Sequence, residues 1–267
     1  MAGVLREGAE KGWKNYDDLS PGMDTNRLPN TADWSGKNLD IKLENDAVLS
    51  LSFGGETAKW SLGEEAGGET GEDPYEEVFI ARDIYFIDIF FAVKGNESLS
   101  LVFNSKTGRV ITVRTTILDR LPSGGTRVAQ EFLTGTIEGV MPTGEPPAPT
   151  RDLIGYRSIN TYSSNHTYEH FYINSKRYAW QCLEGVQKGQ GDMDYATYYK
   201  LEENMYLFCF REKIIPVASV FFFDFNKGTN TGKFLGLTSE GKVCNAGTGA
   251  FIQKMSFNCY PTGVEPV

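Results

Sequence analysis

Two adjacent charged residues, Arg211 and Glu212, end a strongly apolar run in the second half of the chain. The run YLFCFREKIIP begins at Tyr206, and its aromatic composition is typical of a strand. Alternate side chains of a strand share a face, so Glu212 lies with Tyr206, Phe208 and Phe210, and Arg211 lies with Leu207 and Cys209. A charge inside apolar structure is costly unless it is paired, and such charges often mark functional sites. The alternative, of equal weight, is that both charges lie in water at the end of the strand.

A phenol-rich segment gives the second signal. Tyr168, His170 and Tyr172 alternate, so they project from one face of a predicted strand. A later predicted strand, from Asp194 to Leu201, adds three more tyrosines. Phenols, one imidazole and two charges would form an apolar pocket with polar tips, as small-molecule sites usually have. Each tyrosine taken alone also suits a half-buried sheet, but the cluster as a whole favours a pocket.

These residues predict acid/base chemistry that needs no cofactor. In this hypothesis Arg211 holds a carboxylate or enolate oxygen, Glu212 or His170 moves a proton, and tyrosines orient the substrate. The candidate catalytic residues are His170, Arg211, Glu212 and Tyr199. The candidate substrate-binding residues are Tyr168, Tyr172, Trp180, Tyr195, Tyr198, Tyr206, Phe208 and Phe210.

Motifs for cofactors and for activated nucleophiles are absent from the sequence. There is no P-loop, no GxGxxG after a strand, no GxSxG and no HExxH. Two histidines and four dispersed cysteines offer too few ligands for a zinc or iron site. We therefore expect neither a metal nor another cofactor.

The chain is acidic, with a formal net charge of −9 over 267 residues. No run of Lys and Arg exceeds two residues, which disfavours nucleic acid and anionic membrane surfaces as partners. The N-terminal segment lacks the apolar region of a secretion signal, and the apolar runs are too short to span a membrane. We expect a cytoplasmic protein with reduced cysteines and a small hydrophobic or aromatic ligand. A homodimer is left open.

The elements that must position these residues occur twice. The segment from Phe53 resembles the segment from Phe171 at a spacing of roughly 120 residues, the length of a small domain. Three aromatic pairs carry the match: Trp60 with Trp180, Tyr75 with Tyr195, and Tyr85 with Tyr206. At this spacing Val78 and Phe79 stand where Tyr198 and Tyr199 stand in the second copy. The additional tyrosines, His170 and the charged pair belong to the second copy alone, so we expect a single active pocket there.

Each copy consists of short aromatic or β-branched runs bounded by Gly and Asn, with little helical periodicity. About seven or eight such runs per copy predict an antiparallel barrel, which removes exposed sheet edges and can hold one small ligand. The predicted fold is mainly β, with two tandem lipocalin-like barrels. The expected boundaries are an N-terminal arm (1–33), the first barrel (34–141), a Pro-rich linker (142–152), the second barrel (153–260) and a tail (261–267).

The second copy closely resembles the C-terminal domain of the MoaF family. Two motifs carry the resemblance: Trp-x-Cys-Leu-x-Gly from Trp180 and Phe-Arg-Glu-Lys-Ile-x-Pro from Phe210. The first copy, with its AKW, PYEEV and DIYFIDIFF segments, resembles the N-terminal domain of that family. The resemblance implies a calycin or lipocalin-like fold and an association with molybdenum-cofactor biosynthesis. The same superfamily contains phenolic acid decarboxylases, an analogy of fold that does not fix function.

Three functions remain open at this point. The favoured one is a cofactor-independent isomerase, cyclase or lyase for a small aromatic or unsaturated molecule, of the kind found in secondary metabolism. The second is a non-catalytic carrier of lipocalin type, which would bind its ligand without changing it. The third is an accessory factor in molybdenum-cofactor biosynthesis.

Overall fold

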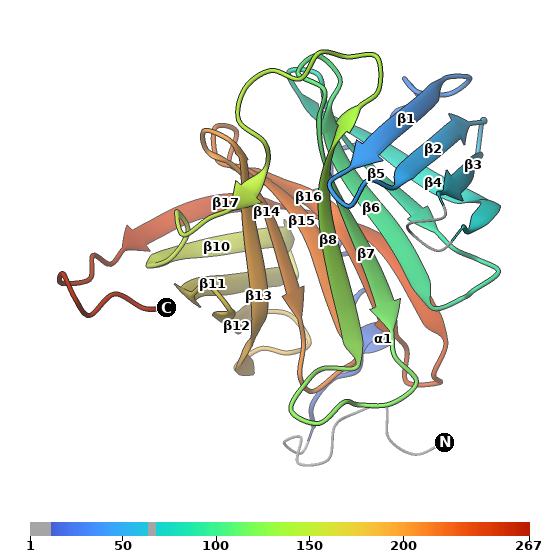
Figure 1. Ribbon diagram of the computed structural model, residues 1–267. Helices are drawn as coiled ribbons and strands as arrows, with labels where there is room; N and C mark the ends of the chain where they lie inside the picture. Colours follow the sequence, from blue (N-terminus) through green and yellow to red (C-terminus); the bar gives the residue numbers. More distant parts are fainter. Residues whose placement is uncertain (1–11, 64–67) are drawn as a thin grey trace. The chain divides into compact units, whose positions relative to one another are not determined.

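The computed structural model describes residues 12–63 and 68–267, which are almost entirely strand. Within this range the chain forms one short helix, α1 (Tyr16–Leu19), and the strands β1 to β17 (Figure 1). The described residues divide into two compact units. One unit holds residues up to Arg27, Ile117–Ala129 and Ala148–Val267, and the other holds Leu28–Thr116 and Gln130–Pro147.

The first barrel consists of eight antiparallel strands in sequence order. They are β1 (Asn38–Leu43), β2 (Val48–Phe53), β3 (Thr57–Leu62), β4 (Thr70–Ala81), β5 (Ile84–Phe90), β6 (Glu97–Asn104), β7 (Arg109–Ile117) and β8 (Val128–Ile137). The sheet closes because β1 pairs with both β2 and β8. Leucine, isoleucine and aromatic side chains fill its interior.

The second barrel repeats this arrangement. Its strands are β10 (Tyr156–Ser163), β11 (His166–Asn174), β12 (Arg177–Glu184), β13 (Gly191–Glu202), β14 (Met205–Arg211), β15 (Val217–Asp224), β16 (Thr229–Leu237) and β17 (Val243–Phe257). It closes where β12 pairs with the first half of β13. The second half of β13 pairs with a further short strand, β9 (Ala148–Pro149), which lies inside the segment predicted as a linker. Two tandem antiparallel barrels are thus confirmed.

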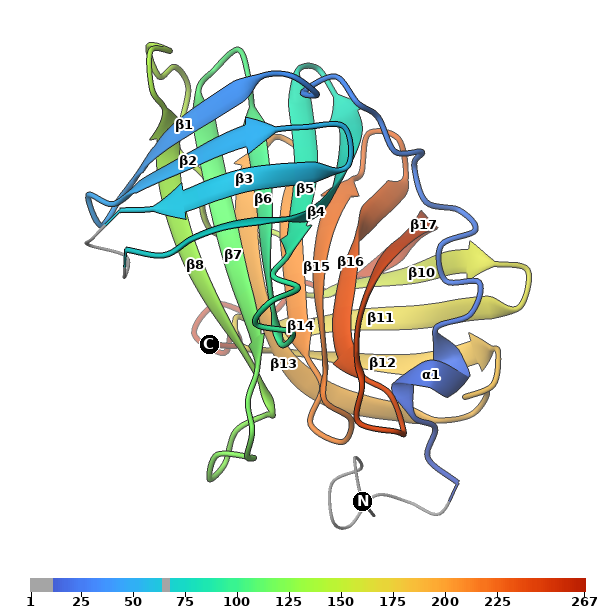
Figure 2. The same cartoon turned by 90° about the vertical axis from the view of Figure 1, so that its right-hand side faces the viewer.

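The N-terminal arm packs into the core of the second barrel. Trp13, Tyr16, Leu19 and Met23 are buried members of that core, and α1 lies beside β16 (Figure 2). Asp17 anchors the helix by accepting hydrogen bonds from the Ser239 backbone N–H and hydroxyl group. The first part of the predicted arm, residues 1–11, lies outside the described residues.

The same pair of hydrogen bonds to a buried aspartate occurs in both barrels and shows which of their residues correspond. We call this arrangement the clasp. In the first, Asp73 accepts a hydrogen bond from Trp60 Nε1 at 2.8 Å and from the Ala92 backbone N–H at 2.9 Å. In the second, Asp194 accepts from Trp180 Nε1 at 2.8 Å and from the Lys213 backbone N–H at 2.9 Å. Because Ala92 matches Lys213, the residue before each also matches, and Phe91 corresponds to Glu212.

The clasp also corrects part of the predicted alignment. Trp60 precedes Asp73 by 13 residues, whereas Trp180 precedes Asp194 by 14, so the second copy carries one extra residue between β12 and β13. Strand register then matches Tyr75 with Ala196, because Tyr75 pairs with Ile89 as Ala196 pairs with Phe210. The expected pair of Tyr75 with Tyr195 is therefore wrong by one position. For the same reason Tyr198 corresponds to Glu77 and Tyr199 to Val78.

Within the described residues, no helix combines the length and the apolar character that a membrane crossing requires.

Candidate functional site

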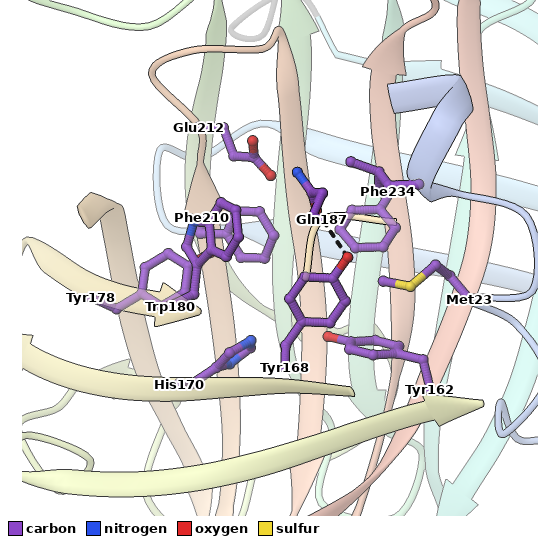
Figure 3. A pocket seen from close by; sticks show the side chains of 11 residues that line it. Met23, Tyr162, Tyr168, His170, Tyr178, Trp180, Gln187, Phe210, Glu212 and Phe234 are labelled. Carbon is purple, nitrogen blue, oxygen red and sulfur yellow. Dashed lines mark hydrogen bonds between the residues drawn. The ribbon is translucent and has the colours of Figure 1, made fainter. Parts of the chain in front are cut away.

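A narrow cavity opens at one end of the second-barrel interior (Figure 3). Its wall comprises Leu19, Met23, Tyr162, Tyr168, His170, Tyr178, Trp180, Gln187, Phe210, Glu212 and Phe234. The empty space, mouth included, is about 360 Å³, of which about 30 Å³ admits the centre of a water molecule. The closed cavity therefore accommodates a few waters or a slender molecule.

The first barrel has apolar residues at the positions that form this cavity. Strand register matches Tyr168 and His170 of β11 with Leu49 and Leu51 of β2, because His170 pairs with Trp180 as Leu51 pairs with Trp60. Tyr178 likewise corresponds to Ala58. The polar lining is thus specific to the second barrel and is not required by the fold.

Glu212 is a buried carboxyl group that faces the cavity. Its side chain lines the cavity although the residue is only 8% exposed, and no hydrogen bond joins its carboxyl group to another described residue. Burial is the main cause that raises the pKa of Glu212 well above its ordinary value, and the charges of Asp194 and Asp192 raise it further. The neutral carboxylic acid, which can donate a hydrogen bond or a proton, is therefore the favoured form.

Asp194 holds negative charge next to this acid. Burial raises the pKa of Asp194 to about 6, opposed by the hydrogen bonds from Trp180 and the Lys213 backbone. Lys213 also places its ammonium group 2.9 Å from the carboxylate of Asp192. Near neutral pH the clasp therefore keeps Asp194 largely ionised, and this charge favours the protonated form of Glu212.

His170 is the neutral imidazole of the cavity. It is 3% exposed, and its ring lies among Tyr172, Tyr178 and Phe208, with centroids 5.4 to 6.2 Å away. Burial lowers the pKa of His170 to about 3, so the ring stays uncharged near neutral pH. Its Nδ1 atom has no hydrogen-bond partner among the described residues. An imidazole in this state is a weak base and serves better as a hydrogen-bonding group.

Tyr168 and Gln187 form a polar pair at the other side of the cavity. The Tyr168 hydroxyl donates a hydrogen bond to Gln187 Oε1 at 2.9 Å, and Gln187 is 2% exposed. This bond leaves Gln187 Nε2 buried without a partner among the described residues. Figure 3 shows the Gln187 amide nitrogen turned toward the carboxyl group of Glu212.

The N-terminal arm supplies an apolar wall. Leu19 and Met23 line the cavity, and Trp13 packs edge-on against Trp180 with centroids 6.0 Å apart. The backbone carbonyl of Met23 accepts hydrogen bonds from the Gly249 N–H and the Thr248 hydroxyl group, which fasten the arm to β17. The site is therefore complete only with the arm in place.

The structure brings together only part of the predicted site. His170, Glu212, Tyr168, Trp180 and Phe210 line the cavity. Tyr172, Tyr198, Tyr206 and Phe208 belong to the aromatic core of the same barrel but do not line the cavity.

Three predicted residues, Tyr195, Tyr199 and Arg211, project from the opposite face of their strands and do not line this cavity. Arg211 follows the inward-facing Phe210 and donates a hydrogen bond to Thr197 Oγ1 at 3.1 Å. Tyr195 donates to the Gly124 carbonyl, and Tyr199 pairs with the β9 residue Pro149. The alternation of β14 put Arg211 and Glu212 on opposite faces from the outset, so both could not enter one cavity.

Sequence reasoning missed several cavity residues. Tyr162, Tyr178, Gln187 and Phe234, together with the arm residues Leu19 and Met23, were not predicted. Tyr178 shares the alternation of β12 with the predicted Trp180 and could have been found in that way, whereas β10, which carries Tyr162, contains no predicted site residue. Gln187 lies in a loop, where no periodicity indicates direction. Among the described residues, no three His, Cys, Asp or Glu side chains group as a metal site requires.

Comparisons with known proteins identify the family. Residues 11–119 match the model of the MoaF N-terminal domain, and residues 147–257 match that of the MoaF C-terminal domain. Protein MoaF of Klebsiella aerogenes is 35% identical over 190 residues, which cover 66% of this chain and 72% of that protein.

The similarity of this chain to solved structures is weak. A crystal structure from Burkholderia vietnamiensis, named provisionally as a beta-lactamase, is 15% identical with a TM-score of 0.34 and covers 42% of this chain and 100% of its own. The DNA polymerase III beta chain of Streptococcus pneumoniae is 7% identical with a TM-score of 0.15, over 87% of this chain and 81% of its own. The two domain matches and the Klebsiella relative together show that this chain belongs to the MoaF family.

Proposed function

We propose that the second barrel binds a small, uncharged, unsaturated molecule and transfers protons to and from it without a cofactor. The observation that carries this proposal is Glu212, a buried carboxylic acid whose carboxyl group has no hydrogen bond to any described residue and faces a cavity, at a position where the first barrel has Phe91. A buried unpaired acid costs stability, so a purely structural barrel would gain by replacing it.

Glu212 is the proton-transferring group in this proposal. Its raised pKa supplies an acid that keeps its proton at neutral pH, and the carboxylate left after donation becomes a base. One residue can then donate a proton at one atom of the substrate and accept a proton from another, which is an isomerisation. His170, whose low pKa makes it a weak base, orients the substrate by hydrogen bonding.

The lining favours uncharged ligands. The eleven residues around the cavity include no Lys or Arg, and the negative charge of Asp194 lies close behind Glu212. An anion would lose its hydration without gaining a compensating cation, so carboxylates, phosphates and oxyanions are disfavoured. The phenols and aromatic rings suit a flat apolar body.

Deuterium exchange tests the proposal directly. A panel of uncharged cyclic unsaturated compounds is incubated with the protein in D2O, and mass spectrometry reports deuterium uptake. We expect uptake by at least one class of compound, with the rate falling about 100- to 10,000-fold in Glu212→Gln, which keeps the shape but loses the acid. The matched control is Phe91→Leu at the same position in the first barrel, which should leave the rate unchanged.

Two other outcomes would replace this proposal. Ligand-dependent thermal stabilisation with ligand recovered unchanged and undeuterated would indicate a carrier, because binding alone stabilises the folded state.

Membership of the MoaF family favours a second candidate, an accessory role in molybdenum-cofactor biosynthesis. Loss of molybdoenzyme activity on gene deletion, restored by a Glu212→Gln allele, would support that role and separate it from chemistry at Glu212.

A further inference from the structure

Gln187 carries a buried hydrogen-bond donor that is unused within residues 12–63 and 68–267. The residue is 2% exposed, its carbonyl oxygen accepts from Tyr168, and Nε2 has no partner among the described residues. Leaving a buried donor unsatisfied costs free energy, because its hydrogen bond to water is lost and not replaced. An acceptor supplied by a ligand would remove that cost.

Glu212 presents a second donor to the same space. Both side chains line the cavity, no hydrogen bond joins them, and Figure 3 shows the amide nitrogen and the carboxyl group turned toward one another. A carboxylic acid O–H and an amide N–H are both donors, so a single acceptor atom with two lone pairs can satisfy them together.

We infer that the substrate is an uncharged carbonyl compound whose oxygen lies between the Gln187 amide N–H and the Glu212 O–H. This inference rests on the proposed function and names its substrate class. Tyr168 is a positioning residue, because its hydroxyl group holds the Gln187 carbonyl and so directs Nε2 into the cavity. The first barrel has Leu49 at the position of Tyr168, and the pair is therefore absent there.

Other acceptors fit less well. A carboxylate or phosphate would bring negative charge beside Asp194 with no Lys or Arg in the lining. An alcohol oxygen can accept, but its own O–H then needs a further acceptor. A ketone or aldehyde oxygen brings two lone pairs, no proton and no charge, which is what two converging donors require.

The arrangement supports enolisation as the elementary step. One oxygen of Glu212 gives its proton to the carbonyl oxygen, while the other accepts the hydrogen of the adjacent carbon. The C–H bond breaks and its electron pair forms the carbon–carbon double bond, as the carbonyl π pair becomes the new O–H bond. Glu212 ends neutral, as it began, so no further reactant is needed.

Matched probes test the carbonyl subsite. We would titrate the full-length protein with cyclopentanone, cyclohexanone and cyclohex-2-en-1-one, each beside the alkene in which a methylene group replaces the oxygen. Ligand-observed NMR gives the affinities, and mass spectrometry in D2O gives exchange at the carbon next to the carbonyl. The variants are Gln187→Leu, which removes the donor, and Glu212→Gln, which keeps a donor but not the acid. Gln181→Leu, on the outer side of β12, is the matched control.

We expect at least one ketone to bind about 10-fold more tightly than its alkene, the worth of one to two net hydrogen bonds. Gln187→Leu should remove this preference, and Glu212→Gln should keep binding but lose exchange. No preference for any ketone, or a preference that survives Gln187→Leu, overturns the carbonyl subsite. Ketone preference without exchange in the wild type would keep the subsite and overturn the proposed catalysis. Exchange that is unaffected by Gln187→Leu would keep the proposed catalysis and overturn the carbonyl subsite.

Discussion

The two barrels have the same strands and the same tryptophan–aspartate clasp, yet their interiors differ in chemistry. Leu49, Leu51 and Phe91 of the first barrel correspond to Tyr168, His170 and Glu212 of the second. In the first barrel, Phe91 stacks on Trp60 with centroids 4.4 Å apart. The comparison shows that this fold forms with apolar residues at these three positions. The polar groups of the second barrel are therefore not required to form the barrel.

The clasp that both barrels share should give the largest effect on stability. Replacing Asp73 or Asp194 by Ala orphans a buried tryptophan Nε1, at a cost of roughly 1–3 kcal/mol, and also a part-buried backbone N–H, at a smaller cost. We expect Asp73→Ala to be the more damaging, because Asp194→Ala also removes a negative charge that raises the pKa of the buried Glu212 and so lowers the cost of burying that residue. Urea unfolding of both variants measures the costs. A greater loss in Asp194→Ala would contradict the difference drawn between the barrels.

The buried imidazole should make the second barrel sensitive to acid. His170 has a pKa of about 3 when folded and an ordinary value near 6.5 when unfolded, so the unfolded state binds more protons between these values. Stability should therefore fall as pH drops below about 6.5, by up to roughly 1.4 kcal/mol per pH unit from this residue. His170→Leu should remove most of that slope in urea unfolding from pH 7 to pH 4.

Leu51, the residue of the first barrel that matches His170, provides a second test of acid sensitivity. Leu51→His introduces an imidazole at the matching position of the first barrel, where Leu51 is a buried member of the apolar core. We expect this variant to lose stability at every pH and to steepen the acid slope. An unchanged slope in His170→Leu would show that other groups cause the acid sensitivity.

Glu212 should lower the stability of the second barrel as pH rises, whereas His170 lowers it as pH falls. The pKa of Glu212 is raised in the folded state, so the folded protein binds more protons than the unfolded one once pH exceeds about 4.5. This residue's contribution to stability therefore falls as pH rises toward its folded pKa. Glu212→Gln should gain stability relative to wild type as pH rises from 5 to 8, because the amide cannot ionise. Infrared spectroscopy at pH 7 should show a protonated carboxylic acid band that this variant lacks.

The smallest expected effect comes from Tyr168→Phe. The change removes one buried hydrogen bond to Gln187, worth about 1 kcal/mol, and keeps the ring packed on Trp180. We expect ketone affinity to weaken less than 10-fold, because Gln187 remains but is no longer held in one orientation. The matched Leu49→Met in the first barrel should leave ketone affinity unchanged. Equal ketone affinity in Tyr168→Phe and wild type would argue against a positioning role for Tyr168.

Much of the architecture could be predicted from the sequence. Alternating apolar residues, turn residues and the repeated tryptophans indicate tandem antiparallel barrels, because side chains in a strand alternate between two faces regardless of context. Glu212, His170 and Tyr168 were found for the same reason, since each sits on the inward face of a strand with a clear pattern.

Other parts of the site could not be predicted, for physical reasons. A one-residue difference between β12 and β13 shifts the alignment of the copies, and a shift of one residue reverses the face of every side chain. Tyr195 and Tyr199 were predicted from the tyrosine content of β13, whose alternation puts them on the opposite face from the buried Tyr198. Gln187 and Met23 reach the cavity from irregular segments, whose direction depends on long-range packing.

The sequence by itself determined that the chain folds as two β-barrels and that the second alone carries the additional tyrosines, an imidazole and the pair Arg211 and Glu212. These follow from composition and strand alternation, which are local properties. Only the tertiary structure decided that Glu212 is buried beside Asp194 while its neighbour Arg211 is excluded, and that the N-terminal arm closes the cavity. Burial and charge proximity set the pKa of an acid, and both depend on which distant residues surround it.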